Sequence, residues 1–86
     1  MPKFRKRPVT IEARLYEEAN HDELIAWCDG YGITSIPSGE KTIIVPTLEG
    51  KMTAKVGDWI IKGIKGEFYP CDPEVFFHTY DLVLED

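Results

Sequence analysis

GDWIIKGIKGEFYPCDPEVF, residues 57–76, decides the fold because it contains two turns, two strands and a helix start in succession. Gly57-Asp58 and Lys65-Gly66 are the expected turns, since glycine tolerates the backbone angles that close reversals need. The WIIKG and EFYPC runs that follow these turns are rich in β-branched and aromatic residues, which favour strands. Asp72-Pro73-Glu74 then predicts the start of a short helix, with an acidic N-cap before a proline.

The segments on either side extend this pattern. KTIIVPTLEG (41–50) predicts a strand that ends at a Glu49-Gly50 hairpin turn, and KMTAKV (51–56) predicts the returning strand. Because three close reversals follow one another, we expect these strands to form an antiparallel meander. After the short helix, YDLVLE (80–85) predicts a final strand.

The first third of the chain predicts one strand and one helix. VTIEARLY (9–16) alternates apolar and polar residues, which is typical of a half-buried strand. A helix over 21–29 should follow, with Asn20 as its N-cap, Glu23 completing a capping box and Gly30 ending it. Its apolar residues recur at helical spacing: Leu24, Trp27, Cys28 and Tyr31.

These elements predict an α+β fold in one domain over residues 1–86. We expect a small, twisted antiparallel β-sheet or a partly open barrel, with one main helix and one short C-terminal helix. Ile60 alternates with Trp59 and Ile61, so both faces of the WIIKG strand are apolar. That strand should therefore be central in its sheet or lie at a subunit contact.

Size and composition limit the function classes. A chain of 86 residues with 43 % apolar residues is expected to fold, but it buries only about 60 % of the surface of its unfolded chain, so a homo-oligomer is expected. No apolar run approaches the roughly 20 residues of a membrane helix, and no secretory signal is recognisable. Cys28 and Cys71 have no nearby ligand partners, which favours reduced thiols in the cytoplasm.

The net charge of −5 is unevenly distributed. Residues 1–7, which we call the basic arm, carry four cations and no acid: Lys3, Arg5, Lys6 and Arg7. The rest of the chain is strongly acidic and should repel a polyanion, so general nucleic-acid binding is not expected. The basic arm can instead meet one anionic ligand, or pair with an acidic surface on its own subunit or on another.

Nearly the whole chain resembles a family of short phage and prophage proteins. The resemblance rests on LEGKMTAKVGDWIIKGIKGEFYPCDPEVFFHTY (48–80), which is similar to the C-terminal signature of the family. FRKRPVTIEARLY (4–16) resembles its N-terminal strand, and ELIAWC (23–28) resembles its helix. The family has no assigned activity, so the resemblance implies a phage-type origin and a cytoplasmic location in the host, and it transfers no catalytic residue.

The residues give little support to catalysis or metal binding. Cys71 precedes a helix start that should lower its thiol pKa, and the short helix could bring it near His78, but no motif places an orienting Asn or Asp. His21 and His78 lack the spacing of metal ligands. Adjacent carboxylates such as Glu85-Asp86 are explained by solvation. We therefore expect that the protein is not an enzyme and that it binds no metal and no cofactor.

Binding remains, and the first hypothesis is a small anionic, nucleotide-like ligand. Aromatic rings can stack on a base, and the candidates are Trp59, Phe68 and Tyr69. Cationic side chains can bind phosphates, and the candidates are Arg5, Arg7, Lys62 and Lys65. Backbone amides at the helix start (72–74) would add weaker donors. With the resemblance, this pattern raises the hypothesis that the protein sequesters an immune signal of the host. The alternative explanation is that Trp59 and Phe68 belong to the core.

The second hypothesis is that the domain binds protein. It would inhibit a host protein through its acidic surface, or assemble with itself as a structural phage protein. The position of the basic arm separates the two hypotheses. If the arm folds over Lys62, Lys65 and Tyr69, an anion pocket exists; if it reaches an acidic patch, it serves assembly.

Overall fold

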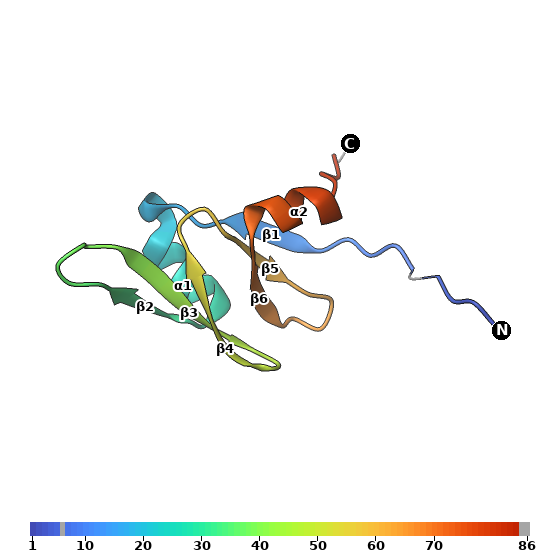
Figure 1. Ribbon diagram of the computed structural model, residues 1–86, viewed down its shortest axis with the longest axis horizontal. Coiled ribbons are helices and arrows are strands. Elements are labelled where there is room, and N and C mark those ends of the chain that lie inside the picture. Colours follow the sequence, from blue (N-terminus) through green and yellow to red (C-terminus); the bar gives the residue numbers. More distant parts are fainter. Residues whose placement is uncertain (6, 85–86) are drawn as a thin grey trace.

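A computed structural model describes residues 1–5 and 7–84 (Figure 1). The described part of the chain contains these elements in order: β1 (Glu12–Leu15), a 3₁₀ turn (Glu18–Asn20), α1 (His21–Cys28), β2 (Tyr31–Thr34), β3 (Lys41–Thr47), β4 (Gly50–Lys55), β5 (Trp59–Lys62), β6 (Phe68–Cys71) and α2 (Pro73–Thr79). They form two three-stranded antiparallel sheets, ordered β1-β5-β6 and β2-β3-β4. The α+β class is confirmed, and the sheets do not close into a barrel.

The expected single meander is wrong, because β4 and β5 belong to different sheets. Tyr16, directly after β1, bonds the turn between them: its N–H donates to the Asp58 carbonyl (2.8 Å), and its carbonyl accepts from Gly57 N–H (2.9 Å). The Asp58 side chain holds the same turn by accepting from Lys55 N–H (3.0 Å). The chain therefore continues alongside β1, with Leu15 opposite Trp59, instead of returning along β4.

The core lies between the two sheets and α1. Both sheets and α1 contribute fully buried residues to it. These residues are Tyr16, Leu24, Cys28, Ile43, Val45, Ala54 and Ile60. β5 is the central strand of its sheet, as its two apolar faces predicted. Ile60 points into this core, and Ile61 is fully buried on the opposite face, where α2 packs. Buried Tyr16 is hydrogen-bonded through its hydroxyl to His21 Nδ1 (2.6 Å).

The ends of α1 agree with the prediction in position but not in their bonds. Asn20 is the N-cap residue, as predicted, but its side chain makes no hydrogen bond to the helix, so the expected capping box with Glu23 does not form. The Asn20 side chain instead donates to the Leu15 carbonyl and accepts from Glu17 N–H (both 2.8 Å). At the other end Asp29, not Gly30, adopts the left-handed conformation (φ 56°). Gly30 is needed for space, since a Cβ there would lie 2.5 Å from the Ile44 carbonyl oxygen.

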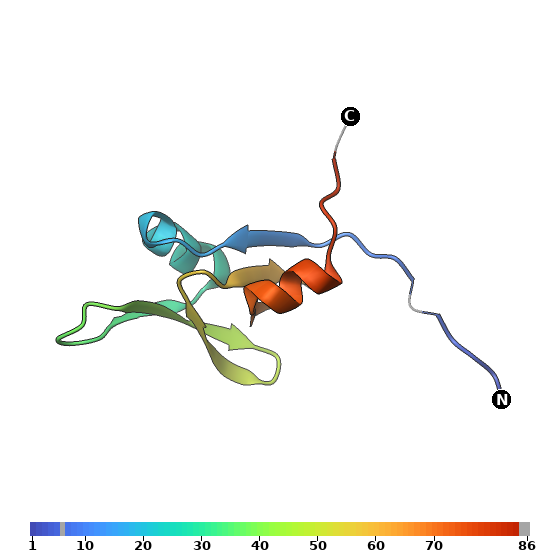
Figure 2. The same ribbon diagram turned by 45° about the horizontal axis from the view of Figure 1, so that its top comes forward.

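The start of α2 is as predicted, and the segment after it is not. The Asp72 carboxylate accepts from Glu74 N–H (2.9 Å) and Val75 N–H (3.4 Å), with Pro73 at the first helical position. The expected strand over 80–85 does not form in its described part, 80–84. Both views show the chain leaving the end of α2 away from the sheets, so no strand edge lies beside it (Figures 1 and 2). Glu85 and Asp86 lie outside the described residues.

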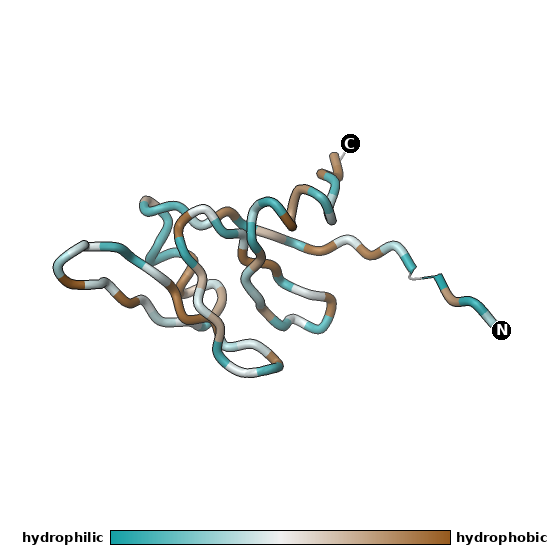
Figure 3. Tube along the Cα trace, in the orientation of Figure 1, coloured by the Kyte–Doolittle hydropathy of each residue, from teal (hydrophilic) through white to brown (hydrophobic). Residues whose placement is uncertain are grey.

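The basic arm extends from the body, and its described residues are all exposed. The trace of the arm is mostly hydrophilic (Figure 3). The radius of gyration of 14.8 Å exceeds the roughly 12 Å of a compact chain of this length. Lys6, the fourth cation of the arm, lies outside the described residues. In the described part of the chain, no helix is long and apolar enough to cross a membrane.

Candidate functional site

The register of β5 and β6 separates the residues expected to form one site. Lys62 lies opposite Phe68, whereas Tyr69 lies opposite Ile61. Paired residues share a face and neighbouring residues alternate, so Lys62 and Tyr69 project from opposite faces of the sheet. Lys62 Nζ lies 5.9 Å from the centroid of the Phe68 ring instead. Lys65 is in the turn between the strands, where its N–H donates to Glu67 Oε1 (3.0 Å).

The two other expected stacking residues are already packed within the protein. The ring of Trp59 stacks on Phe76 of α2, with centroids 4.3 Å apart and an interplanar angle of 6°. Phe68 packs edge-on against Trp27 at 5.0 Å. Both rings are half-buried, and both have an intramolecular partner where the hypothesis placed a base. The structure thus agrees with the alternative that Trp59 and Phe68 are packing residues.

A groove of about 460 Å³ does bring two of the expected residues together. It lies where the basic arm meets the β5–β6 turn and the end of α2, and we call it the arm groove. Arg7 and Tyr69 both line it, and Arg5 lies two residues beyond, on the exposed arm. The described residues that line it are Arg7, Pro8, Val9, Ile11, Gly63, Ile64, Glu67, Tyr69, Thr79 and Tyr80.

A pair of tyrosine hydroxyls lies in the arm groove. The oxygens of Tyr69 and Tyr80 are 3.3 Å apart. Burial raises the pKa of Tyr69 to about 12, and the hydrogen bond to Tyr80 and nearby charges add to the shift. At neutral pH the Tyr69 hydroxyl is therefore protonated and can donate to an anion. The sequence analysis missed Tyr80 because residues 80–85 were expected to form a strand; in the structure Tyr80 directly follows α2, with its ring 5.0 Å from that of Phe76.

The hydroxyl pair of Tyr69 and Tyr80 predicts that the free energy of unfolding falls at high pH. Unfolded Tyr69 loses its proton near pH 10.0, whereas the folded protein retains it until about pH 12. The raised pKa thus contributes stability below pH 10 that is lost as the pH rises towards 12. Denaturant unfolding at pH 8 to 11.5 should show this fall, and Tyr80→Phe, which removes the hydrogen bond, should reduce it. The same slope in wild type and Tyr80→Phe would contradict this role of the pair.

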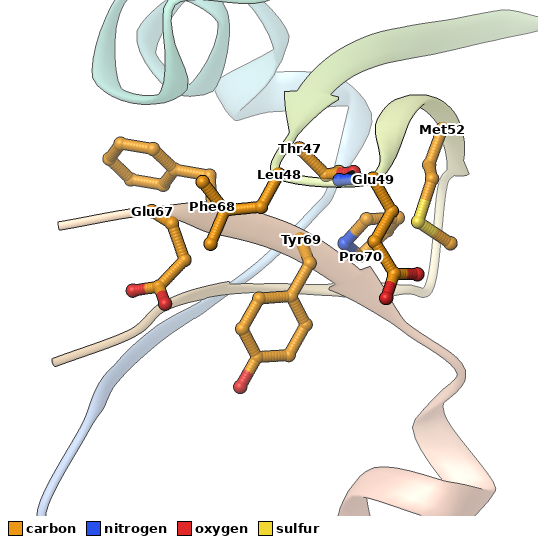
Figure 4. Close-up of a pocket in the computed structure, with 8 residues that line it drawn as sticks. All are labelled: Thr47, Leu48, Glu49, Met52, Glu67, Phe68, Tyr69 and Pro70. Carbon is orange, nitrogen blue, oxygen red and sulfur yellow. Dashed lines mark hydrogen bonds between the residues drawn. The ribbon is translucent and has the colours of Figure 1, made fainter. Parts of the chain in front are cut away.

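A second hollow, of about 310 Å³, separates the β3–β4 hairpin from β6, and we call it the hairpin pocket (Figure 4). It is lined by Thr47, Leu48, Glu49, Met52, Glu67, Phe68, Tyr69 and Pro70. Figure 4 shows side chains of the hairpin and of β6 meeting around it. The sequence analysis missed this pocket because its two walls belong to different sheets.

The cysteines and histidines form no activated group in the described structure. Burial and the neighbouring carboxylates of Asp72 and Asp58 raise the pKa of Cys71, so the expected lowering by the helix start is wrong. Burial also raises the pKa of Cys28. His78 is exposed on the last turn of α2. Among residues 1–5 and 7–84, no three His, Cys, Asp or Glu side chains converge as metal ligands.

Comparison with known proteins adds no relative: no family model, curated protein or solved structure matches the chain. The resemblance to short phage proteins therefore stays a prediction. What the fold and the two hollows define is a small α+β protein whose basic arm borders one of them.

Proposed function

We propose that this protein is a non-catalytic phage accessory protein that binds a small anionic, nucleotide-like ligand in the arm groove. The observation that carries the proposal is that Arg7 lines the same groove as the Tyr69–Tyr80 hydroxyl pair. A guanidinium and protonated hydroxyls are donors suited to phosphate oxygens. Arg5 extends the same positive segment of the chain and can reach a second phosphate.

The remaining walls of the arm groove suit the rest of such a ligand. Val9, Ile11 and Ile64 supply apolar surface for a base, and the tyrosine rings can stack on it. Glu67 offers an acceptor to an amino or hydroxyl group of the ligand. A volume of about 460 Å³ lies within the roughly 300–1,000 Å³ of small-molecule sites.

The resemblance to phage proteins supports a biological setting for this proposal. A phage benefits from capturing an immune signal of its host, which requires tight binding in the host cytoplasm and no turnover. Such a protein needs no cofactor. It is proposed to act as a homo-oligomer, because a domain of this size has little surface of its own to enclose a ligand.

The proposal predicts a thermal shift that depends on Arg7. Unfolding would be followed with inorganic phosphate, AMP, ADP-ribose and cyclic dinucleotides as probes. A probe at 100 times its dissociation constant stabilises the folded state by about 2.7 kcal/mol, which raises the Tm of a domain this small by several degrees. Arg7→Ala should remove the shift, because it deletes the one cation among the described residues of the groove.

Lys62→Ala is the matched control, because it removes one cation from the opposite face of the sheet and should keep the shift. Loss of the shift in both variants would indicate general electrostatic attraction and would contradict a site in the arm groove. If no probe raises the Tm, ligand binding is contradicted and the protein-binding function below is favoured.

The second candidate is a protein-binding module, either an inhibitor of a host protein through its acidic surface or a self-assembling structural protein. It is favoured by large apolar side chains exposed on both extended segments, among them Phe4, Leu82 and Leu84. Exposed apolar groups on segments that leave the body are suited to contact another chain. Retention of one host protein by the immobilised wild type, with no thermal shift, would support this function.

A further inference from the structure

The hairpin pocket has the composition of an acceptor for a cationic segment with an apolar side chain. Leu48, Met52 and Pro70 give it apolar walls, while Glu49 and Glu67 add two carboxylates. Among the described residues that line it, none is a lysine or an arginine. Leu48 is 74 % exposed, so the pocket leaves apolar surface open to solvent. A negatively charged rim around such a surface favours a positively charged partner.

The basic arm supplies the complementary group. Phe4 is 94 % exposed and stands between Lys3 and Arg5. An aromatic ring flanked by two cations matches a hollow with apolar walls and two carboxylates. The volume also suffices, because about 310 Å³ exceeds the ~150 Å³ of a cavity that accepts a benzene ring.

We propose that Phe4 of a second copy of this chain occupies the hairpin pocket, with Lys3 and Arg5 of that copy meeting Glu49 and Glu67. The proposal goes beyond ligand binding, since it concerns another partner and the hairpin pocket, which shares only Glu67 and Tyr69 with the described lining of the arm groove. A second copy fits better than the same chain, because the arm leads away from its own body in both views (Figures 1 and 2). Reciprocal exchange of two arms would give a closed dimer with two equivalent contacts.

The dissociation constant of the dimer, measured by sedimentation equilibrium, tests this exchange. Phe4→Ala should raise it by about tenfold or more, as expected for truncating a buried aromatic anchor. It should leave Tm unchanged in dilute protein, because Phe4 makes no contact with its own body that would stabilise the monomer. Phe77→Ala is the matched control: this ring is 73 % exposed, lies outside the hairpin pocket and should not affect the dimer.

A charge exchange tests the ionic part of the contact. Glu49→Arg and Arg5→Glu should each weaken the dimer, and combining them in one chain should restore most of the affinity, because the pair is then re-formed with reversed signs. Higher salt should weaken the wild-type dimer. If the loss of dimer affinity in the double variant equals the sum of the losses in the two single variants, the contact between these two residues is overturned.

Cysteine cross-linking identifies the chain that supplies the arm. Phe4→Cys and Leu48→Cys would be made in separate chains, each with Cys71→Ser, and mixed under oxidising conditions. A disulfide-linked pair of one chain of each kind is the expected result. A wild type that is monomeric at every concentration would overturn the proposal. So would a chain carrying both cysteines that cross-links only within itself.

Discussion

Ile60→Ala is expected to lower the free energy of unfolding by about 2–5 kcal/mol, the range for truncating a buried isoleucine. Ile60 is fully buried on β5, on the face that meets α1 and the other sheet, so the cavity would open where all three layers join. A domain of this length has a total stability of only about 4–13 kcal/mol. Urea unfolding followed by tryptophan fluorescence would measure the loss.

Ile64→Ala is the matched control, because it makes the same change four residues later at a side chain that is 70 % exposed. Its effect should stay within about 0.5 kcal/mol, as for most surface substitutions. Equal losses in the two variants would mean that Ile60 does not lie in the core that joins the sheets.

Phe76→Ala is expected to detach α2 and to abolish ligand binding in the arm groove. Phe76 stacks on Trp59 at 4.3 Å and lies 5.0 Å from the ring of Tyr80. α2 has seven residues, and a helix this short does not persist in water without packing. The loss in stability should be about 2–3 kcal/mol, less than for a fully buried phenylalanine.

Amide hydrogen exchange would measure the detachment, and the expected result is loss of protection in α2 with β3 and β5 still protected. The thermal shift with the anionic probes should disappear as well, because Tyr80 follows α2 and lines the arm groove. Phe77→Ala truncates the neighbouring, exposed phenylalanine and should leave both measurements unchanged. Protection of α2 in Phe76→Ala equal to that in Phe77→Ala would show that the Trp59–Phe76 stack does not hold the helix.

The sequence predicted the helices and strands far better than it predicted which strands pair with one another. Three features were predicted correctly because each depends on residues within about four positions of one another. They are the hairpin turn after β3, the strands β5 and β6, and the Asp72 cap. The N-cap position of α1 was predicted correctly at Asn20, but its capping hydrogen bond was not, because the Asn20 side chain has two possible roles. Its side chain satisfies the backbone of Leu15 and Glu17 in the preceding turn, and only the path of the chain from β1 decides between these roles.

The candidate site was predicted only in part, for a related reason. Arg7 and Tyr69 do line one groove, but Tyr80 closes it from a segment that was expected to be a strand. Lys62 was placed with Tyr69 because the two are close in sequence. A pleated strand sends alternate side chains to opposite faces, so the register of Ile61 with Tyr69 separates them.

By itself, the sequence determined the α+β class, the central position of β5 and the acidic body with its basic arm. Turn residues, caps and alternating polarity act over a few positions, so they can be recognised in the sequence alone. Only the tertiary structure decided that β5 pairs with β1 instead of β4, and that two hollows open beside β6. The pairing of β5 with β1 follows from backbone bonds between Tyr16 and the turn at Gly57 and Asp58, about forty residues along the chain. No local pattern specifies which distant backbone groups will satisfy each other.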